Sequence, residues 1–366
     1  MNQRETPRRG PRGLGGLCVA WCLWALALAP AHANDQAAPT AAHASAAHAP
    51  SETVVPALAA ATQAALDAKG DPAFEPKVTD LDWHDAARQR DVPVRLYWPS
   101  QVAPDAHVPL VVFSHGIGSS RTGYSYLGKH FAAHGIASLH LQHVGSDRKV
   151  WLGNPFGIIS RLWDATSERE AVNRVRDLSF ALDELLERSE YGARVDRKRI
   201  AAAGHSYGAN TVMLAAGATL QRDGVSVQYR EPRIRAALLL SAPPFYGEPE
   251  MKKILGAITL PSLHITATED VIRVPGYYSP AADRLAVFDA AGSKVKALVV
   301  FEGGSHNIFT DRPATGGLTL NPRVKSATQD LTLAFLRSVF DASDEGMKQW
   351  PGKHGALISR WVSLAP

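Results

Sequence analysis

Short apolar segments alternate with amphipathic segments through the central part of the chain, and this alternation restricts the fold more than any other feature. The apolar segments, which we expect to be strands, are Leu110–Ser114, Ile136–Leu141, Ile200–Ala203, Ala236–Leu240, Leu263–Thr266 and Ala297–Phe301. The segments with helical spacing are Thr122–His134, Glu168–Arg188, Ser206–Ala218 and Lys325–Phe340. Strands without a polar face are buried on both sides, and alternation with helices implies right-handed crossovers. The sequence therefore predicts an α/β domain with a doubly wound, mostly parallel sheet.

An antiparallel hairpin is expected ahead of this sheet. Val78–Trp83 and Val92–Trp98 have the composition of strands and flank the polar turn Asp85–Asp91. Two such segments joined by a polar turn favour a β-hairpin. Two other segments fall outside the alternation: the aromatic-containing Val144–Thr166, and the tail from Asp341, which we expect to pack on the domain surface.

The first 33 residues have the pattern of a secretory signal peptide. An arginine-rich start is followed by the apolar run Leu14–Ala29 and by Ala31-His32-Ala33, a small-residue cleavage site. The apolar run is shorter than the ~20 residues of a spanning helix, although an uncleaved anchor remains an alternative. Both cysteines, Cys18 and Cys22, lie within this segment. We therefore predict an exported protein, periplasmic or secreted, with no disulfide and no stable membrane insertion after cleavage.

The remaining chain divides by composition into three parts. Residues 34–75 are rich in alanine and proline and predict a disordered tether, 76–340 a catalytic domain, and 341–366 the packed tail. The formal net charge of the whole chain is +4. The signal segment contributes +3 of it through four arginines and Glu5, so the mature chain is nearly neutral. This balance speaks against a nucleic-acid partner.

The pentapeptide Gly204-His205-Ser206-Tyr207-Gly208 carries the clearest chemical signal. It matches G-x-S-x-G between an apolar strand and a helix, the setting of a nucleophile elbow. Glycines two residues either side let backbone segments approach closely, while the sharp turn exposes the serine hydroxyl at a helix N-terminus. The pattern predicts Ser206 as a nucleophile.

A serine nucleophile needs a base and a group that orients the base. In proteins with a nucleophile elbow of this kind, the catalytic residues follow one another in the chain as serine, acid and histidine. Asp270 follows the predicted strand Leu263–Thr266 and is our choice for the acid, with its neighbour Glu269 as the alternative. His306 follows the last strand in a glycine-containing loop and is predicted to be the base.

Two backbone amides are needed to stabilise the oxyanion. We predict those of Tyr207, next to the nucleophile, and of Ile117, in the glycine-containing loop Ser114–Ser120. His115 is interpreted as a side chain that packs or hydrogen-bonds to hold this loop.

No cofactor or metal is expected. His140 and His143 are three residues apart but lack an obvious third ligand, and the sequence has no phosphate loop or dinucleotide fingerprint. The aromatic residues Trp151, Phe156 and Trp163 are predicted to line an acyl pocket.

These motifs resemble those of the serine α/β-hydrolases grouped as predicted dienelactone hydrolases, near the platelet-activating-factor acetylhydrolase-like esterases and the cutinase-like polyester hydrolases. The resemblance extends from about Trp83 to Phe309. Its motifs are Asp82-Trp83, Arg88–Val94, Tyr97–Pro99, Phe113–Gly116, Gly204–Gly208, Thr268–Asp270 and Gly304–His306. It implies the α/β-hydrolase fold, a Ser206–Asp270–His306 triad and Ile117 and Tyr207 as oxyanion donors. Dienelactone hydrolases use a cysteine nucleophile, so the serine here favours simple carboxylic esters, small or lipid.

Three other functions remain open at this level. A serine peptidase of the prolyl-oligopeptidase type shares the elbow and the triad order, but the segment before Val78 is too short for its propeller domain. A non-catalytic relative would bind a ligand in the same cleft. The alanine- and proline-rich tether is the only feature consistent with an adhesion or wall-associated role.

Overall fold

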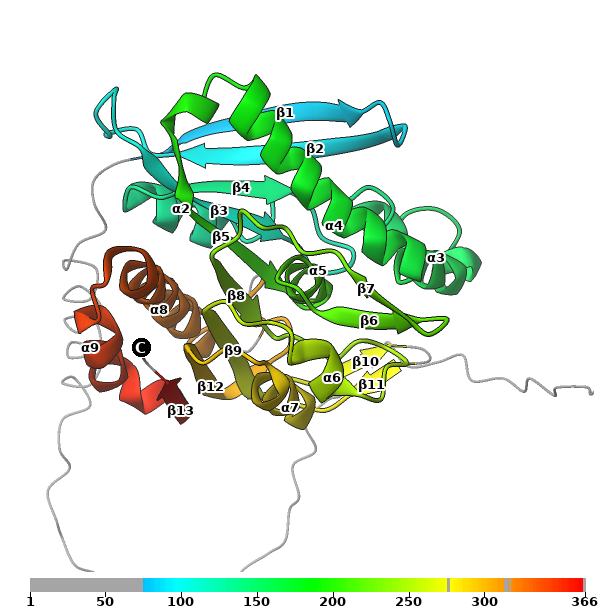
Figure 1. Ribbon diagram of the computed structural model, residues 1–366. Coiled ribbons are helices and arrows are strands. Elements are labelled where there is room, and N and C mark those ends of the chain that lie inside the picture. Colours follow the sequence, from blue (N-terminus) through cyan, green and yellow to red (C-terminus); the bar gives the residue numbers. More distant parts are fainter. Residues whose placement is uncertain (1–74, 275–276, 313–314, 316, 365–366) are drawn as a thin grey trace, which may run out of the picture. The chain divides into compact units, whose positions relative to one another are not determined.

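A nine-stranded, mostly parallel sheet forms the centre of the molecule in the computed structural model (Figure 1), which describes residues 75–274, 277–312, 315 and 317–364. In spatial order the strands are β1 (Lys77–Asp85), β2 (Arg90–Trp98), β4 (Ala137–Leu141), β3 (Val108–Ser114), β5 (Val195–His205), β8 (Ala236–Leu240), β9 (Ser262–Glu269), β12 (Lys296–Ser305) and β13 (Ile358–Leu364). The six strands from β4 to β12 are parallel, whereas β1 and β2 at one end of the sheet and β13 at the other pair antiparallel with their neighbours. The predicted α/β class, parallel sheet and N-terminal hairpin are confirmed.

Helices cover both faces of this sheet (Figure 1). They are α2 (Ser125–Ala133), α3 (Ile158–Ala165), α4 (Glu168–Asp183), α5 (Tyr207–Ala215), α6 (Met251–Leu255), α7 (Ala282–Ala290), α8 (Leu320–Asp341) and α9 (Glu345–His354). Neighbouring strand residues such as Val111 and Val112 belong to different apolar clusters, because successive side chains of a strand point to opposite faces. The cluster containing Val112 packs against α4, α5 and α6, and the cluster containing Val111 packs against α2, α8 and α9.

The C-terminal tail, which was expected to pack on the domain surface, also contributes a strand to the central sheet. The strand β13 pairs with β12 along Lys296–Phe301. Trp350 of α9 is buried, its indole N–H donates to the carbonyl of Ala327, and its ring lies 5.1 Å from that of Trp361. The tail thus covers an edge strand that would otherwise expose unpaired backbone groups.

Two small hairpins lie outside the central sheet and were not predicted. They are β6 (Thr219–Arg222) with β7 (Val225–Gln228), and β10 (Ile272–Val274) with β11 (Tyr277–Ser279). The first hairpin has a recognisable sequence signal, the pair Asp223-Gly224, which favours a type I′ turn. Both residues have the positive φ that this turn requires. The segment Val144–Thr166, which falls outside the predicted alternation, contains α3.

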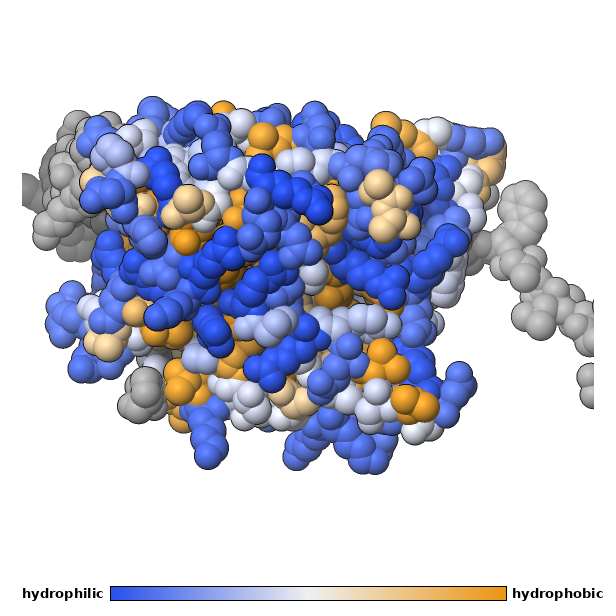
Figure 2. Space-filling model, turned by 45° about the horizontal axis from the view of Figure 1, so that its top comes forward, coloured by the Kyte–Doolittle hydropathy of each residue, from blue (hydrophilic) through white to orange (hydrophobic). Residues whose placement is uncertain are grey.

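Hydrophilic side chains predominate on the face shown in Figure 2, and hydrophobic ones form separate small groups between them. Several large apolar side chains around α3 are exposed: Trp151, Leu152, Phe156, Ile159 and Trp163. Helices long and apolar enough to cross a bilayer are absent from the ranges that the structure describes. The predicted signal peptide, 1–33, and all but the last residue of the predicted tether, 34–75, lie outside these ranges.

Candidate active site

Ser206 occupies the one-residue connection between β5 and α5. Its backbone dihedrals, φ 56° and ψ −121°, are strained for a residue with a side chain. The two flanking glycines make the turn possible. A Cβ on Gly208 would lie 1.9 Å from the carbonyl oxygen of Ser114, and one on Gly204 would lie 2.3 Å from the carbonyl oxygen of Gly208. Larger residues at either position would push the serine out of place.

The structure brings the predicted acid and histidine to this serine. The Nε2 atom of His306 lies 2.8 Å from the Ser206 hydroxyl oxygen, and its Nδ1 atom lies 2.7 Å from a carboxylate oxygen of Asp270. All three residues follow carboxyl ends of parallel strands, which meet at one edge of the sheet. The alternative acid, Glu269, is exposed at the end of β9, and its carboxylate makes no hydrogen bond with the imidazole. This arrangement allows proton transfer from the hydroxyl to the ring.

Asp270 is completely buried and is held by three groups. Besides His306, the hydroxyl of Thr266 donates to its second oxygen at 2.7 Å, and a guanidinium nitrogen of Arg284 lies 3.5 Å away. Burial on its own raises the pKa of a carboxyl group, but the hydrogen bond with His306 and the charge of Arg284 outweigh it. The pKa of Asp270 is therefore held well below its ordinary value, and the group is a carboxylate at neutral pH.

The two predicted oxyanion donors lie on opposite sides of Ser206 in sequence and line the same cavity. Within the part of the chain that the structure describes, neither the Ile117 N–H nor the Tyr207 N–H has a protein acceptor. Their neighbours are committed elsewhere, since the N–H of Gly118 donates to Ser146 and that of Gly116 approaches the Tyr124 hydroxyl. An oxyanion hole requires two amides near the nucleophile without other acceptors, so Ile117 and Tyr207 stay the candidates for it.

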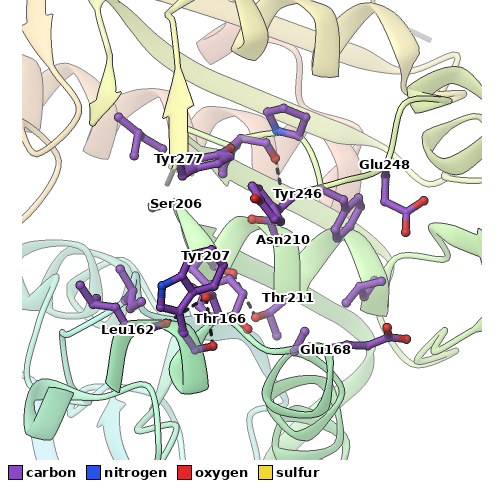
Figure 3. A pocket seen from close by; sticks show the side chains of 18 of the residues that line it. Leu162, Thr166, Glu168, Ser206, Tyr207, Asn210, Thr211, Tyr246, Glu248 and Tyr277 are labelled. Carbon is purple, nitrogen blue, oxygen red and sulfur yellow. Dashed lines mark hydrogen bonds between the residues drawn. The ribbon is translucent and has the colours of Figure 1, made fainter. Parts of the chain in front are cut away.

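A cavity of about 380 Å³ opens from Ser206, and apolar and aromatic side chains make up most of its wall. In Figure 3, Tyr207 and Tyr277 lie on either side of Ser206, while Glu168 and Glu248 lie away from it. The apolar and aromatic residues of its wall come from α3, α4, α5, both small hairpins and the connecting segments near them: Ile117, Trp151, Ile159, Leu162, Trp163, Val172, Leu214, Leu220, Tyr229, Phe245, Tyr246, Ile272, Val274 and Tyr277. Its lining suits an apolar group.

Two of the three aromatic residues that we predicted for this cavity line it, and the third does not. Trp151 and Trp163 line it, and the Trp151 indole also donates to the carbonyl of Gly118 at 2.9 Å. Phe156 does not line it, and its side chain is 88% exposed, so its prediction is wrong. Phe156 lies in the turn before α3, and the helical spacing of the following residues turns Ile159 and Trp163 inward instead.

Several polar residues near the site were missed by sequence reasoning. Thr266 and Arg284 contact Asp270, and the fully buried Arg174 lies 4.4 Å from the centre of the Tyr207 ring. A charged residue inside the apolar face of the predicted helix Glu168–Arg188 was the available signal for Arg174, because isolated buried charges are costly. His140 and His143, considered as metal ligands, bond instead to Ser138 and Gly123, and to Ser114 and Asp177.

Comparison with known proteins gives matches in sequence and in structure. Residues 86–148 match the family described as platelet-activating factor acetylhydrolase, isoform II. The platelet-activating factor acetylhydrolase of Cavia porcellus is 24% identical over 307 residues, covering 71% of this chain and 63% of that protein. The one of Canis lupus familiaris is 24% identical over 258 residues, covering 60% and 52%. The chain thus matches less than two thirds of the length of these relatives.

A solved structure with the same fold is that of a ferulic acid esterase from Streptomyces cinnamoneus. The superposition has a TM-score of 0.60 at 21% identity and covers 80% of this chain and 98% of that one. At this identity the likeness establishes the fold. The strand order and the helices on both faces agree with the α/β-hydrolase fold that the sequence motifs imply.

Proposed function

Because the chain is an α/β-hydrolase related to the platelet-activating factor acetylhydrolases, we propose that it is a serine hydrolase that cleaves carboxylic esters through an acyl-enzyme. The observation that carries this proposal is the continuous hydrogen-bond chain from Asp270 through His306 to the Ser206 hydroxyl, at 2.7 and 2.8 Å. A serine hydroxyl at neutral pH is a weak nucleophile unless a base accepts its proton. Here the base is in contact with it, at the mouth of an apolar cavity.

In the first half of the reaction, Ser206 attacks the ester carbonyl carbon while His306 Nε2 accepts the hydroxyl proton. Asp270 accepts the Nδ1–H bond, keeps the ring in the correct tautomer and stabilises the imidazolium. The negative charge forms on the former carbonyl oxygen, which accepts hydrogen bonds from the Ile117 and Tyr207 amides. The imidazolium then gives its proton to the departing alcohol, leaving an ester on Ser206.

The second half releases the acyl group. A water molecule gives a proton to His306 and attacks the acyl carbonyl, again with the oxyanion held by the two amides. Collapse of the tetrahedral intermediate returns the proton to Ser206 and frees the carboxylic acid. Every proton that moves is carried by His306, and no step requires a cofactor.

The cavity supports small-molecule or lipid esters with an apolar acyl or alcohol group as substrates. The relatives found by sequence are platelet-activating factor acetylhydrolases, so an acetyl ester should be among the substrates that are tested.

The domain boundaries and the location of the protein are part of the proposal. Residues 76–340 form the catalytic domain, with 341–366 as its C-terminal extension and 34–75 as a tether. Residues 1–33 are the export signal, and the mature protein is periplasmic or secreted. The N-terminal sequence of the protein recovered from the cell envelope or medium tests this, since a start at Asn34 supports cleavage and a retained Met1 contradicts it.

The activity is tested with a panel of nitrophenyl esters from acetate to long acyl chains, and with a fluorophosphonate probe that reacts with activated serines. We expect the wild-type protein to turn over at least one ester and to be labelled, and Ser206→Ala to lose both. A non-catalytic binding protein would remain unlabelled.

Labelling combined with cleavage of peptides but not of esters would indicate the serine peptidase instead. Ester turnover that survives Ser206→Ala would show that the proposed site is not responsible.

A further inference from the structure

Two buried side chains, His115 and Arg174, form hydrogen bonds to the loop after β3 on its interior side. Both are at most 1% exposed. The imidazole Nδ1 of His115 lies 2.7 Å from the carbonyl oxygen of the next residue, Gly116, and Arg174 donates to the carbonyl oxygen of His115 itself. Two consecutive peptide carbonyls are therefore bound on the interior side.

The tautomer of His115 follows from its other contact. The backbone N–H of His143 donates to His115 Nε2 at 3.1 Å, so Nε2 carries a lone pair. In a neutral ring the hydrogen is then on Nδ1, which donates to the Gly116 carbonyl. Burial, followed by the nearby Arg174 charge, lowers the pKa of His115 well below its ordinary value and keeps the ring neutral.

The bound carbonyl determines where the next amide points. The carbonyl of Gly116 and the N–H of Ile117 belong to one peptide unit, and in a trans peptide these groups point in opposite directions. The Gly116 carbonyl accepts from His115 Nδ1 and also from the backbone N–H of Ser119 at 3.2 Å. We therefore expect the opposite N–H, that of Ile117, to face the cavity that Ile117 lines together with Ser206. A hydrogen bond to the carbonyl also polarises the same unit and makes its N–H a better donor.

Arg174 connects this loop to the second oxyanion donor. Its guanidinium donates to the hydroxyls of Thr211, Ser146 and Ser114 at 2.9, 2.8 and 3.1 Å. It also lies 4.4 Å from the centre of the Tyr207 ring, within the range of a cation–π contact. One fixed group therefore touches both the His115 carbonyl and the residue after the nucleophile.

A buried chain of hydrogen bonds supports Arg174 from below. Ser114 Oγ lies 2.9 Å from His143 Nε2, and His143 Nδ1 lies 3.0 Å from Asp177. These three side chains have the connectivity of a catalytic triad, but all are fully buried, so a substrate has no access to them. Arg90 pairs with Asp177 at 2.9 Å and compensates its charge.

We propose that His115 and Arg174 are positioning residues of the oxyanion hole, which fix the peptides around Gly116 so that the Ile117 amide faces Ser206 before substrate binds. This inference rests on the proposed ester hydrolysis, because only an oxyanion gives the amide something to stabilise. Preorganised donors act on the transition state and not on the bound substrate, so their loss lowers kcat with little change in KM.

The test uses two pairs of variants, assayed for kcat and KM on nitrophenyl acetate. His115→Phe keeps a buried ring without the donor, whereas His115→Asn places an amide N–H near the former Nδ1 position. Arg174→Lys keeps the charge without the planar fork. The matched control is Arg233→Lys, since Arg233 also anchors the helix α4, through the Ser179 carbonyl and Asp183, but has no contact with the site. Thermal unfolding identifies variants that are folded.

We expect His115→Phe and Arg174→Lys to lower kcat about 10- to 100-fold, part of the 10²–10³ attributed to a whole donor, with KM within about twofold. Affinity for a trifluoromethyl ketone, which forms an oxyanion on Ser206, should fall by the same factor. His115→Asn should recover much of the loss, and Arg233→Lys should match the wild type.

The inference is overturned if folded His115→Phe and Arg174→Lys keep wild-type kcat, if His115→Asn is as impaired as His115→Phe, or if Arg233→Lys loses as much as Arg174→Lys. A wild-type protein that neither hydrolyses esters nor reacts with the fluorophosphonate probe defeats the proposed function, and the inference with it. Normal wild-type turnover with undiminished variants defeats the inference alone.

Discussion

The Nε2 atom of His205 lies 2.9 Å from the main-chain carbonyl oxygen of His306. Because a carbonyl only accepts, this nitrogen carries the hydrogen, and the opposite Nδ1 accepts from the Tyr124 hydroxyl at 2.8 Å. Burial lowers the pKa of His205 to about 3, so the ring keeps this neutral form. The elbow residue next to the nucleophile therefore holds the loop that carries the proposed base, and Tyr124 connects it to the amide of Gly116.

Removing the Tyr124 hydroxyl should weaken this connection while the aromatic ring continues to fill its buried position. We expect Tyr124→Phe to lower kcat about 3- to 10-fold, the loss that corresponds to roughly one hydrogen bond, with KM nearly unchanged. The control is Tyr126→Phe, because the Tyr126 hydroxyl is buried and has no partner among the described residues. That variant should retain its activity. Equal kcat for Tyr124→Phe and the wild type on a nitrophenyl ester would contradict the proposed role of the hydroxyl.

The choice of acid predicts opposite results for two neighbouring carboxylates. Asp270→Asn should lower kcat by about 10³–10⁴, because the amide cannot hold the imidazole in the productive tautomer or stabilise its charge. Glu269→Gln should change kcat by less than about twofold, since that side chain is exposed. Steady-state kinetics on one nitrophenyl ester measures both. A severe defect in Glu269→Gln together with an active Asp270→Asn would reverse the assignment.

The pocket predicts which aromatic residue controls acyl preference. Trp163 lines the cavity, so Trp163→Ala should change kcat/KM for long acyl esters about 10- to 100-fold relative to the acetate. Phe156 is 88% exposed, and Phe156→Ala should leave the ratio as it is. The nitrophenyl ester series gives the ratio directly. A shifted preference in Phe156→Ala, or none in Trp163→Ala, would show that α3 is arranged differently during catalysis.

Buried histidines predict acid sensitivity of the fold. Burial lowers the pKa of His140, His143, His205 and His264 from 6.5 to about 3. Between these values the unfolded chain binds protons that the folded chain does not. The contribution of these histidines to the free energy of unfolding is therefore fully present above pH 6.5. It falls as the pH drops toward 3, by about 1.4 kcal/mol per pH unit for each histidine.

Urea unfolding at pH 7, 6 and 5 measures this slope. His264→Gln is the matched variant, because His264 lies away from Ser206 and contacts Ser262 and Phe288. It should reduce the slope by the share of one histidine. An unfolding free energy that is independent of pH between 7 and 5 would contradict the prediction.

Sequence alone determined the features that depend on neighbouring residues. The alternation of apolar and amphipathic segments predicted the parallel sheet, because period and burial are encoded locally. Gly204-His205-Ser206-Tyr207-Gly208 predicted the elbow, since its two glycines meet a steric demand within one turn. Asp270 and His306 could be selected because parallel strands end at one edge of the sheet, and chain order then leaves few polar residues there.

Tertiary structure decided what depends on residues far apart in the chain. It alone turned Asp270 rather than Glu269 toward the imidazole, and directed Phe156 into solvent. It also paired the tail with β12. It placed Arg174, which is 60 residues after Ser114 in the sequence, in contact with the loop that carries the predicted oxyanion donor Ile117. A local pattern states which face of a segment is buried, whereas the partner it meets there depends on how all the other segments pack.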